Sequence, residues 1–151
     1  MKTRRTLGLL AGLALAIVPP VRAQDPALQE AVRAFDPSAA FVFESDRARV
    51  ADFNGDGLAD VSAILVAPER RALVVFNARR DGGYSAYPLF AVLPPGPVEL
   101  RILQPGRHRV VGAEGVIELD KPAIELAFPG KSSALYAWRN GRYQVFGTEN
   151  Y

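Results

Sequence analysis

From residue 40 onward, the chain consists of short apolar runs separated by clusters of Gly, Pro, Asn and Asp. Short runs with a period of two, bounded by turn residues, are typical of β-strands, because successive side chains of a strand point to opposite faces. Residues 61–66 and 72–76 are apolar on both faces apart from Ser62, which indicates central strands buried on both sides. This pattern restricts most of the chain to β structure.

Other runs alternate apolar with charged residues, as expected for strands that are buried on one face only. The run at residues 98–102 alternates in this way. The pair Asp81-Gly82 predicts a turn that returns residues 84–92 antiparallel to the strand at 72–76. Further strands are expected at residues 40–43, 107–111, 116–119 and 124–128.

The closing hairpin is the best determined element, because Asn140-Gly141 is the preferred pair for a two-residue type I′ turn. This turn predicts a register that pairs Arg139 with Arg142, Trp138 with Tyr143, and Tyr136 with Val145. A face of aromatic and β-branched side chains is typical of a sheet core. The alternative is an aromatic binding surface.

One short helix is expected before the strands. Asp25 is a good N-cap and Pro26 suits the first helical turn, where its missing N–H is not needed. Asp36-Pro37 ends the helix, since the residue before proline avoids the helical region. Its apolar stripe consists of Leu28, Ala31, Val32 and Phe35. We therefore expect an all-β single domain, an antiparallel sandwich or roll of eight or nine short strands with one N-terminal helix.

The first 23 residues resemble a removable signal peptide. A basic start is followed by an apolar run at residues 7–18, which is too short to span a bilayer, and Val21-Arg22-Ala23 offers small residues to a signal peptidase. The expectation is a signal peptide at residues 1–23 and a periplasmic or secreted domain at residues 24–151, without a stable membrane anchor. An uncleaved anchor is the alternative, and Arg4-Arg5 leaves twin-arginine export open beside the general secretory route.

The charge of the chain divides unevenly at this boundary. The whole chain carries +2, but residues 1–23 hold four of its 18 basic residues and none of its 16 acidic ones, so residues 24–151 carry −2. A basic nucleic-acid binder is therefore not indicated. The chain has no cysteine, which excludes disulfides and a lipoprotein anchor.

The stretch DFNGDGLAD at residues 52–60 holds three aspartates, with no lysine or arginine between them. Two like unit charges about 4 Å apart repel by roughly 4 kcal/mol at an effective dielectric near 20, so a folded loop needs either wide splaying or a bound cation. The alternate spacing lets a looped backbone turn several oxygens inward, with Gly55 and Gly57 providing the bends. The candidate ligands are Asp52, Asn54, Asp56, the carbonyl oxygen of Leu58, and Asp60.

Oxygen ligands suit calcium, whereas zinc prefers histidine or cysteine, so the hypothesis is a Ca2+ site. A polar turn that binds nothing is the alternative. The loop matches positions 1, 3, 5, 6, 7 and 9 of an EF-hand loop but has Ala63 at position 12, where an EF-hand has glutamate, and a strand rather than a helix is expected to follow.

The D-x-N-G-D-G-x-x-D loop entering an apolar strand resembles the calcium loop of FG-GAP and VCBS repeats. The resemblance covers residues 51–65 and implies the same ligand set. Those repeats build β-propellers, which need several blades, and this chain has a single loop, so a complete propeller is not expected. The loop, combined with the closing segments PAIEL and LYAWRNGRYQVF, also resembles small exported bacterial proteins of unassigned function.

These features predict an exported calcium-binding β domain that is a binding module rather than an enzyme, with a protein or glycan partner and a structural calcium ion. The alternative is a secreted enzyme accessory, or an inhibitor or immunity-type protein that acts on a hydrolase.

Few other residues carry chemistry. His108, the only histidine, is a candidate catalytic residue, and the alternative interpretation is an exposed position on a strand. Glu118, Asp120 and Glu125 could include a glycosidase carboxylate pair, and the alternative is that they lie on the outward faces of strands. Glu44 or Asp46 is a candidate to reach the metal or a water bound to it. The pairs Arg70-Arg71 and Arg79-Arg80 fit solvated strand ends, with an anion-binding patch as the alternative.

Overall fold

The computed structural model describes residues 25–112 and 115–148, so the expected signal peptide lies outside the described residues. Within these ranges the chain forms one helix and ten strands, which confirms the all-β class and the single N-terminal helix. Eight or nine strands were expected, and the described residues form ten. The elements are α1 (Pro26–Phe35), β1 (Val42–Ala51), β2 (Asp60–Ala67), β3 (Arg70–Ala78), β4 (Tyr84–Phe90), β5 (Glu99–Leu103), β6 (Gly106–Arg109), β7 (Val116–Leu119), β8 (Ala123–Ala127), β9 (Ser133–Arg139) and β10 (Arg142–Thr148).

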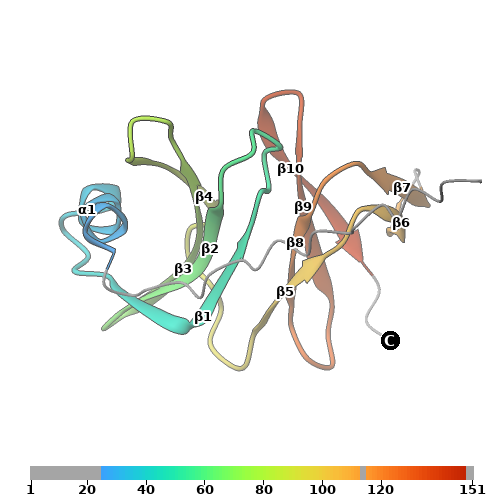
Figure 1. Ribbon diagram of the computed structural model, residues 1–151. Coiled ribbons are helices and arrows are strands. Elements are labelled where there is room, and N and C mark those ends of the chain that lie inside the picture. Colours follow the sequence, from blue (N-terminus) through green and yellow to red (C-terminus); the bar gives the residue numbers. More distant parts are fainter. Residues whose placement is uncertain (1–24, 113–114, 149–151) are drawn as a thin grey trace, which may run out of the picture.

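The elements are stacked in layers (Figure 1). The helix covers one face of a four-stranded antiparallel sheet in the order β1-β2-β3-β4. The other face of that sheet packs against a second antiparallel sheet in the order β10-β9-β8-β5, and the β6–β7 hairpin covers the far side. Each interface between layers holds its own apolar cluster, so the two sheets form a sandwich that is covered on both outer faces.

The helix has the boundaries that its caps predict. Asp25 Oδ1 accepts a hydrogen bond from the Ala27 N–H at 3.0 Å, and Asp36 beyond the last turn is extended at φ −151°. Leu28 and Val32 are buried against the first sheet, as the apolar stripe predicts. In the part of the chain that the structure describes, no helix is long and apolar enough to cross a membrane.

Strand β2 is an inner strand of the first sheet and is buried on both faces, as its composition predicts. Val61, Ala63 and Leu65 face the helix layer, whereas Ile64 faces the second sheet. Strand β3 alternates in the same way and is buried from Ala72 to Asn77. Because both neighbours of β2 are antiparallel, the first sheet is a simple meander, as the Asp81-Gly82 turn predicts for β3 and β4.

The closing hairpin has the predicted register, with Trp138 opposite Tyr143 and Tyr136 opposite Val145. Asn140 and Gly141 both have positive φ, at 52° and 75°, as a type I′ turn requires. The core interpretation of its aromatic face holds for Tyr136, which is 6% exposed and packs toward the first sheet. It is wrong for Val145, which is 63% exposed at the open edge formed by β10.

Strand β1 carries a large bulge. Phe43 pairs with Leu65 and Ala48 pairs with Ala63, so residues 44–47 all lie opposite Ile64. A bulge of this kind bends the strand and interrupts its ladder. Strand β1 is an edge of the first sheet, and it contacts β5, which is an edge of the second.

Candidate metal-binding loop

Residues 52–59 connect β1 to β2, and Asp60 is the first residue of β2, opposite Ala51. The loop is anchored by Phe53, which is fully buried in the cluster between the two sheets. The buried Phe53 side chain and the pairing of Ala51 with Asp60 hold both ends of the loop in place. The position of the loop is therefore set by the sandwich.

Asp52 organises the turn of the loop through three backbone N–H groups. Its Oδ1 accepts hydrogen bonds from Gly55 at 2.7 Å and Asp56 at 3.1 Å, and its Oδ2 accepts one from Gly57 at 2.9 Å. Gly55 and Gly57 have φ of 79° and 86°, which L-residues rarely adopt. Both glycines are therefore needed at the bends, as the sequence predicts.

The tip of the loop is closed by Asn54 and Asp56. Asn54 Oδ1 accepts from the Asp56 N–H at 2.9 Å, and Asn54 Nδ2 donates to Asp56 Oδ2 at 3.1 Å. Asp56 Oδ1 accepts from the Leu58 N–H at 2.8 Å. The side chains of two predicted ligands therefore touch each other at the exposed end of the loop.

Asp60 ties the loop to the sheet. It is fully buried, and its Oδ2 accepts hydrogen bonds from the N–H groups of Phe53 at 2.9 Å and Asn54 at 3.2 Å, while Oδ1 accepts from Ala78 at 2.9 Å. Burial raises the pKa of Asp60 to about 6, an effect that the three N–H donors oppose and the nearby charge of Asp56 reinforces. No ion pair among the described residues includes Asp60.

Polar groups surround the buried carboxyl. The Tyr143 hydroxyl donates to Asn77 Oδ1 at 2.7 Å, and burial together with the charge of Asp60 raises the pKa of Tyr143. Tyr84 donates to Asp25 Oδ2 at 3.0 Å, and burial and this hydrogen bond raise the pKa of Tyr84 to about 12. Both phenols therefore remain neutral near Asp60 at physiological pH.

One basic side chain reaches the loop from elsewhere in the chain. A methyl group built at Gly55 would lie 2.8 Å from Cε of Lys121, so the Lys121 side chain lies across Gly55. Its ammonium donates to Asp120 Oδ2 at 2.7 Å. Sequence reasoning missed this cation, because Lys121 lies in the turn between β7 and β8, and no local pattern marks that turn as a neighbour of residue 55.

The donor set fits calcium in its chemistry, since every candidate ligand offers oxygen. A carboxylate oxygen has two acceptor sites. Asp52 Oδ1 and Asp60 Oδ2 already accept two N–H groups each, whereas Asp52 Oδ2, Asp60 Oδ1 and both oxygens of Asp56 accept one each and keep a lone pair for a metal. In residues 25–112 and 115–148, however, no three acidic, histidine or cysteine side chains gather around a common point. The carboxylates would have to turn from their backbone donors toward one another to share an ion.

Glu44 and Asp46 do not reach this loop. Glu44 pairs with Arg47 at 2.9 Å within the β1 bulge. The bulge begins after Phe43, which lies opposite Leu65. Residues 44–47 lie opposite Ile64, which is four residues along β2 from Asp60, or about 13 Å. This arrangement therefore does not support the hypothesis that Glu44 or Asp46 reaches the metal.

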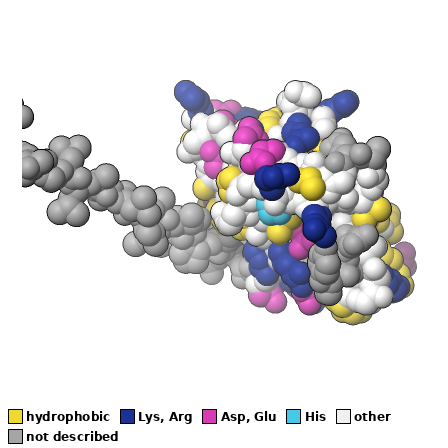
Figure 2. Space-filling model, turned by 90° about the vertical axis from the view of Figure 1, so that its right-hand side faces the viewer, with side chains coloured by type: hydrophobic (Ala, Val, Ile, Leu, Met, Phe, Trp, Pro, Cys, Tyr) yellow, Lys and Arg dark blue, Asp and Glu magenta, His cyan; other side chains and the backbone are white. Residues whose placement is uncertain are grey.

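The other candidate catalytic residues have structural partners. His108 on β6 has Nε2 2.8 Å from the carbonyl oxygen of Gln104. Figure 2 shows the single histidine on the β6–β7 side of the molecule, among intermixed basic and acidic side chains. Asp120 accepts from Lys121, and Glu118 lies in the separate two-stranded β6–β7 layer.

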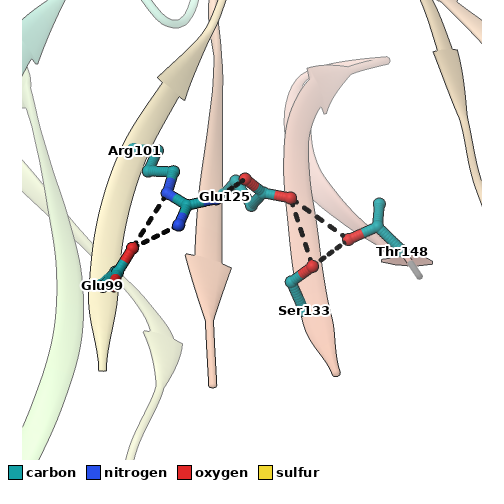
Figure 3. A network of polar contacts seen from close by, with 5 residues as sticks. All are labelled: Glu99, Arg101, Glu125, Ser133 and Thr148. Atoms are coloured by element: carbon teal, nitrogen blue, oxygen red, sulfur yellow. Dashed lines mark hydrogen bonds and ion pairs between the residues drawn. The ribbon is translucent and has the colours of Figure 1, made fainter. Parts of the chain in front are cut away.

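Glu125 belongs to a polar network on the outer face of the second sheet (Figure 3). Its Oε1 accepts from the hydroxyls of Ser133 at 3.2 Å and Thr148 at 3.4 Å, both of which are buried. On its other side, Arg101 lies 3.6 Å from Glu125 Oε2 and also pairs with Glu99. The network joins β5, β8, β9 and β10, and its groups satisfy one another.

Neighbouring arginines of the sequence have different structural partners. Arg70 pairs with Asp36 and lies over the ring of Phe41, and Arg79 pairs with Asp81 in the following turn. Arg71 points to a different part of the molecule, because Leu93 and the Pro94–Gly96 turn lie beside it.

No family model, no curated protein and no solved structure matches this chain. The resemblance of residues 51–65 to FG-GAP and VCBS loops therefore stays a prediction based on the loop motif.

Proposed function

We propose that this chain is an exported β-sandwich binding module in which residues 52–60 hold a structural calcium ion. The observation that carries the proposal is the buried Asp60 carboxyl, which has no ion pair among the described residues and lies in one loop with Asp52 and Asp56. A buried carboxylate without a counter-charge is costly, and a divalent cation at the loop removes that cost.

The ligands in this proposal are the oxygens of Asp52, Asn54, Asp56 and Asp60 with the carbonyl of Leu58, as in the FG-GAP and VCBS loops that the motif resembles. When bound, the ion supplies positive charge between the carboxylates. Asp60 already bonds to Phe53 in the loop and to Ala78 at the end of β3. An ion that holds Asp60 in place therefore links the loop to β2 and β3, which is a structural rather than a catalytic role.

The choice of a binding module over an enzyme is supported by the partners of the candidate catalytic groups. His108 bonds to a backbone carbonyl, and Glu125 is occupied by two hydroxyls and an arginine. General acid–base catalysis needs a titratable group that reaches substrate with its proton free to move. These groups support the structure of the sheet instead.

The experiment is isothermal titration of calcium, and then of magnesium, into metal-free protein and two variants. Asp56→Ala removes an exposed ligand at the loop tip, and Glu30→Ala removes an exposed carboxylate on the helix as the matched control. We expect one calcium site in the wild type and in Glu30→Ala, weaker magnesium binding because magnesium demands a tighter octahedron, and no calcium binding in Asp56→Ala. Equal calcium heats in Asp56→Ala and Glu30→Ala would refute the assignment of the site.

A further inference from the structure

The bulge in β1 opens a groove between the two sheets at one side of the sandwich. Because residues 44–47 leave the ladder opposite Ile64, a cavity of about 650 Å³ forms between β1 and β5. Ile64 and Leu100 contribute apolar lining, and the chain at Gly96-Pro97 forms a further part of the wall. None of the residues that line this groove belongs to the aspartate loop, which follows the C-terminal end of β1.

Arginines dominate the polar lining of the groove. Four arginines from three strands line it, against two acidic residues, Asp46 and Glu99, although the Arg101 guanidinium pairs with Glu125 in the network on the outer face of the second sheet. The arginines are Arg47 and Arg49 on β1, Arg71 on β3 and Arg101 on β5. Since residues 24–151 carry −2 as a whole, this positive site is a local feature of the groove.

Two of the four arginines are neutralised by neighbours. Arg47 pairs with Glu44 at 2.9 Å. Arg101 pairs with Glu99 and with Glu125 (Figure 3), and its Nη1 lies 3.6 Å from Glu125 Oε2. In the part of the chain that the structure describes, neither Arg49 nor Arg71 has an ion pair.

Arg49 and Arg71 are nevertheless held in place by backbone carbonyls. Arg49 Nη1 donates to the carbonyls of Asp46 at 3.2 Å and Ala48 at 2.7 Å. Arg71 Nη2 donates to the carbonyls of Pro94 at 2.6 Å and Gly96 at 2.9 Å. Both residues are half-buried, and these hydrogen bonds hold their guanidinium groups in place without a ligand.

The remaining donors of these two groups are suited to an oxyanion. A guanidinium has five N–H donors in a rigid fork, and each of these arginines commits only one Nη to the backbone. Nε and the other Nη of each are left without an acceptor among the described residues. Guanidinium groups bind carboxylate, phosphate and sulfate oxygens with short, charge-assisted hydrogen bonds, and a partly desolvated cation gains most from such a partner.

We propose that the groove between β1 and β5 binds a small multivalent oxyanion through Arg49 and Arg71. Phosphate, sulfate and carboxylate groups share the required chemistry. The more exposed apolar lining, at Pro97 and Val98, accommodates the body of an organic ligand beside its acidic groups. This inference is independent of the calcium site, because it uses none of the loop residues.

The test is an NMR titration of calcium-free ¹⁵N-labelled protein with pyrophosphate, sulfate and citrate, each at low and at high sodium chloride. We expect millimolar or tighter binding of at least one probe, weakened by salt, with the largest amide shifts at residues 46–49, 71 and 96–101. The probe that binds tightest distinguishes phosphate, sulfate and carboxylate ligands. Absence of saturable shifts with all three probes, or shifts confined to the β6–β7 face, would overturn the proposal.

Variants assign the site to the two arginines. Arg49→Gln and Arg71→Gln should each weaken binding of the preferred probe by about tenfold or more, since each removes charge-assisted hydrogen bonds. Arg80→Gln, an exposed arginine in the β3–β4 turn, is the matched control and should leave the affinity unchanged. Equal affinities in all three variants would refute the assignment. If Arg71→Gln fails to fold, Arg49→Gln and the wild-type shift map decide the question.

Discussion

Gly55 and Gly57 both bend the aspartate loop through positive φ, but their surroundings differ. A methyl group at Gly57 would meet nothing within 4 Å, whereas one at Gly55 would lie 2.8 Å from Cε of Lys121. Gly57→Ala therefore reports backbone strain alone. The left-handed region costs a residue with Cβ roughly 1–2 kcal/mol, so we expect this loss of unfolding free energy.

Gly55→Ala should cost more, because it adds displacement of Lys121 to the same backbone strain. The φ values are similar, 79° and 86°, so the strain is the same to first order. Cε lies near the end of a flexible lysine side chain, so its displacement adds at most the cost of an unfavourable rotamer, about 0.5–1.5 kcal/mol. The expected loss for Gly55→Ala therefore exceeds that for Gly57→Ala and reaches at most roughly 3.5 kcal/mol.

Urea denaturation of the two variants, each in wild-type and Lys121→Ala backgrounds, measures the difference as a double-mutant cycle. The excess cost of Gly55→Ala should disappear in the Lys121→Ala background, where the contact no longer exists. The cost of Gly57→Ala should be the same in both backgrounds. A Gly57→Ala variant as stable as wild type, or an excess at Gly55 that persists without Lys121, would refute this reasoning about the loop.

Three further predictions concern other parts of the chain. Gly141→Val should lower the unfolding free energy by about 1–3 kcal/mol through backbone strain at φ 75°. Gly147→Ala in the same hairpin should change it little, because a methyl group there would meet Val111 at an ordinary 3.7 Å. Equal thermal midpoints for the two variants would contradict the turn assignment. Folding raises the pKa of Asp60 from 3.8 to about 6, so between these two pH values the folded metal-free protein binds more protons than the unfolded chain. Its unfolding free energy should therefore fall by about 3 kcal/mol as the pH rises from about 4 to 7. Chemical denaturation at a series of pH values should show this decrease in the wild type and not in Asp60→Asn. The exported protein should lack residues 1–23 by intact mass, and detection of Met1 on it would contradict the signal peptide.

Features governed by neighbouring residues were predictable from the sequence. Asp25-Pro26 and Asp36-Pro37 define the helix through local capping and steric rules, and Asn140-Gly141 fixes a register through its own backbone preference. The period of the apolar residues likewise identifies β2 as a buried strand. In each case the decisive interaction lies within a few residues along the chain.

Features governed by tertiary contact were not predictable. The strand expected at residues 40–43 continues past the bulge to Ala51, because residues 48–51 pair with β2, and that pairing is not visible in the polar residues 44–47. The contact of Lys121 with Gly55 and the groove at Arg71 each join residues that are far apart in the chain. At the loop, composition identified oxygen donors and glycine bends, but the capture of Asp60 by the Ala78 N–H requires the folded sheet.

A crystal structure of the protein grown in millimolar calcium would show whether residues 52–60 bind the ion. We expect one ion with six to eight oxygen ligands at about 2.3–2.6 Å, among them carboxylate oxygens of Asp52, Asp56 and Asp60, the Asn54 side chain and the Leu58 carbonyl. Density that shows these carboxylates bonded only to backbone N–H groups, with no ion in the loop at that calcium concentration, would contradict it.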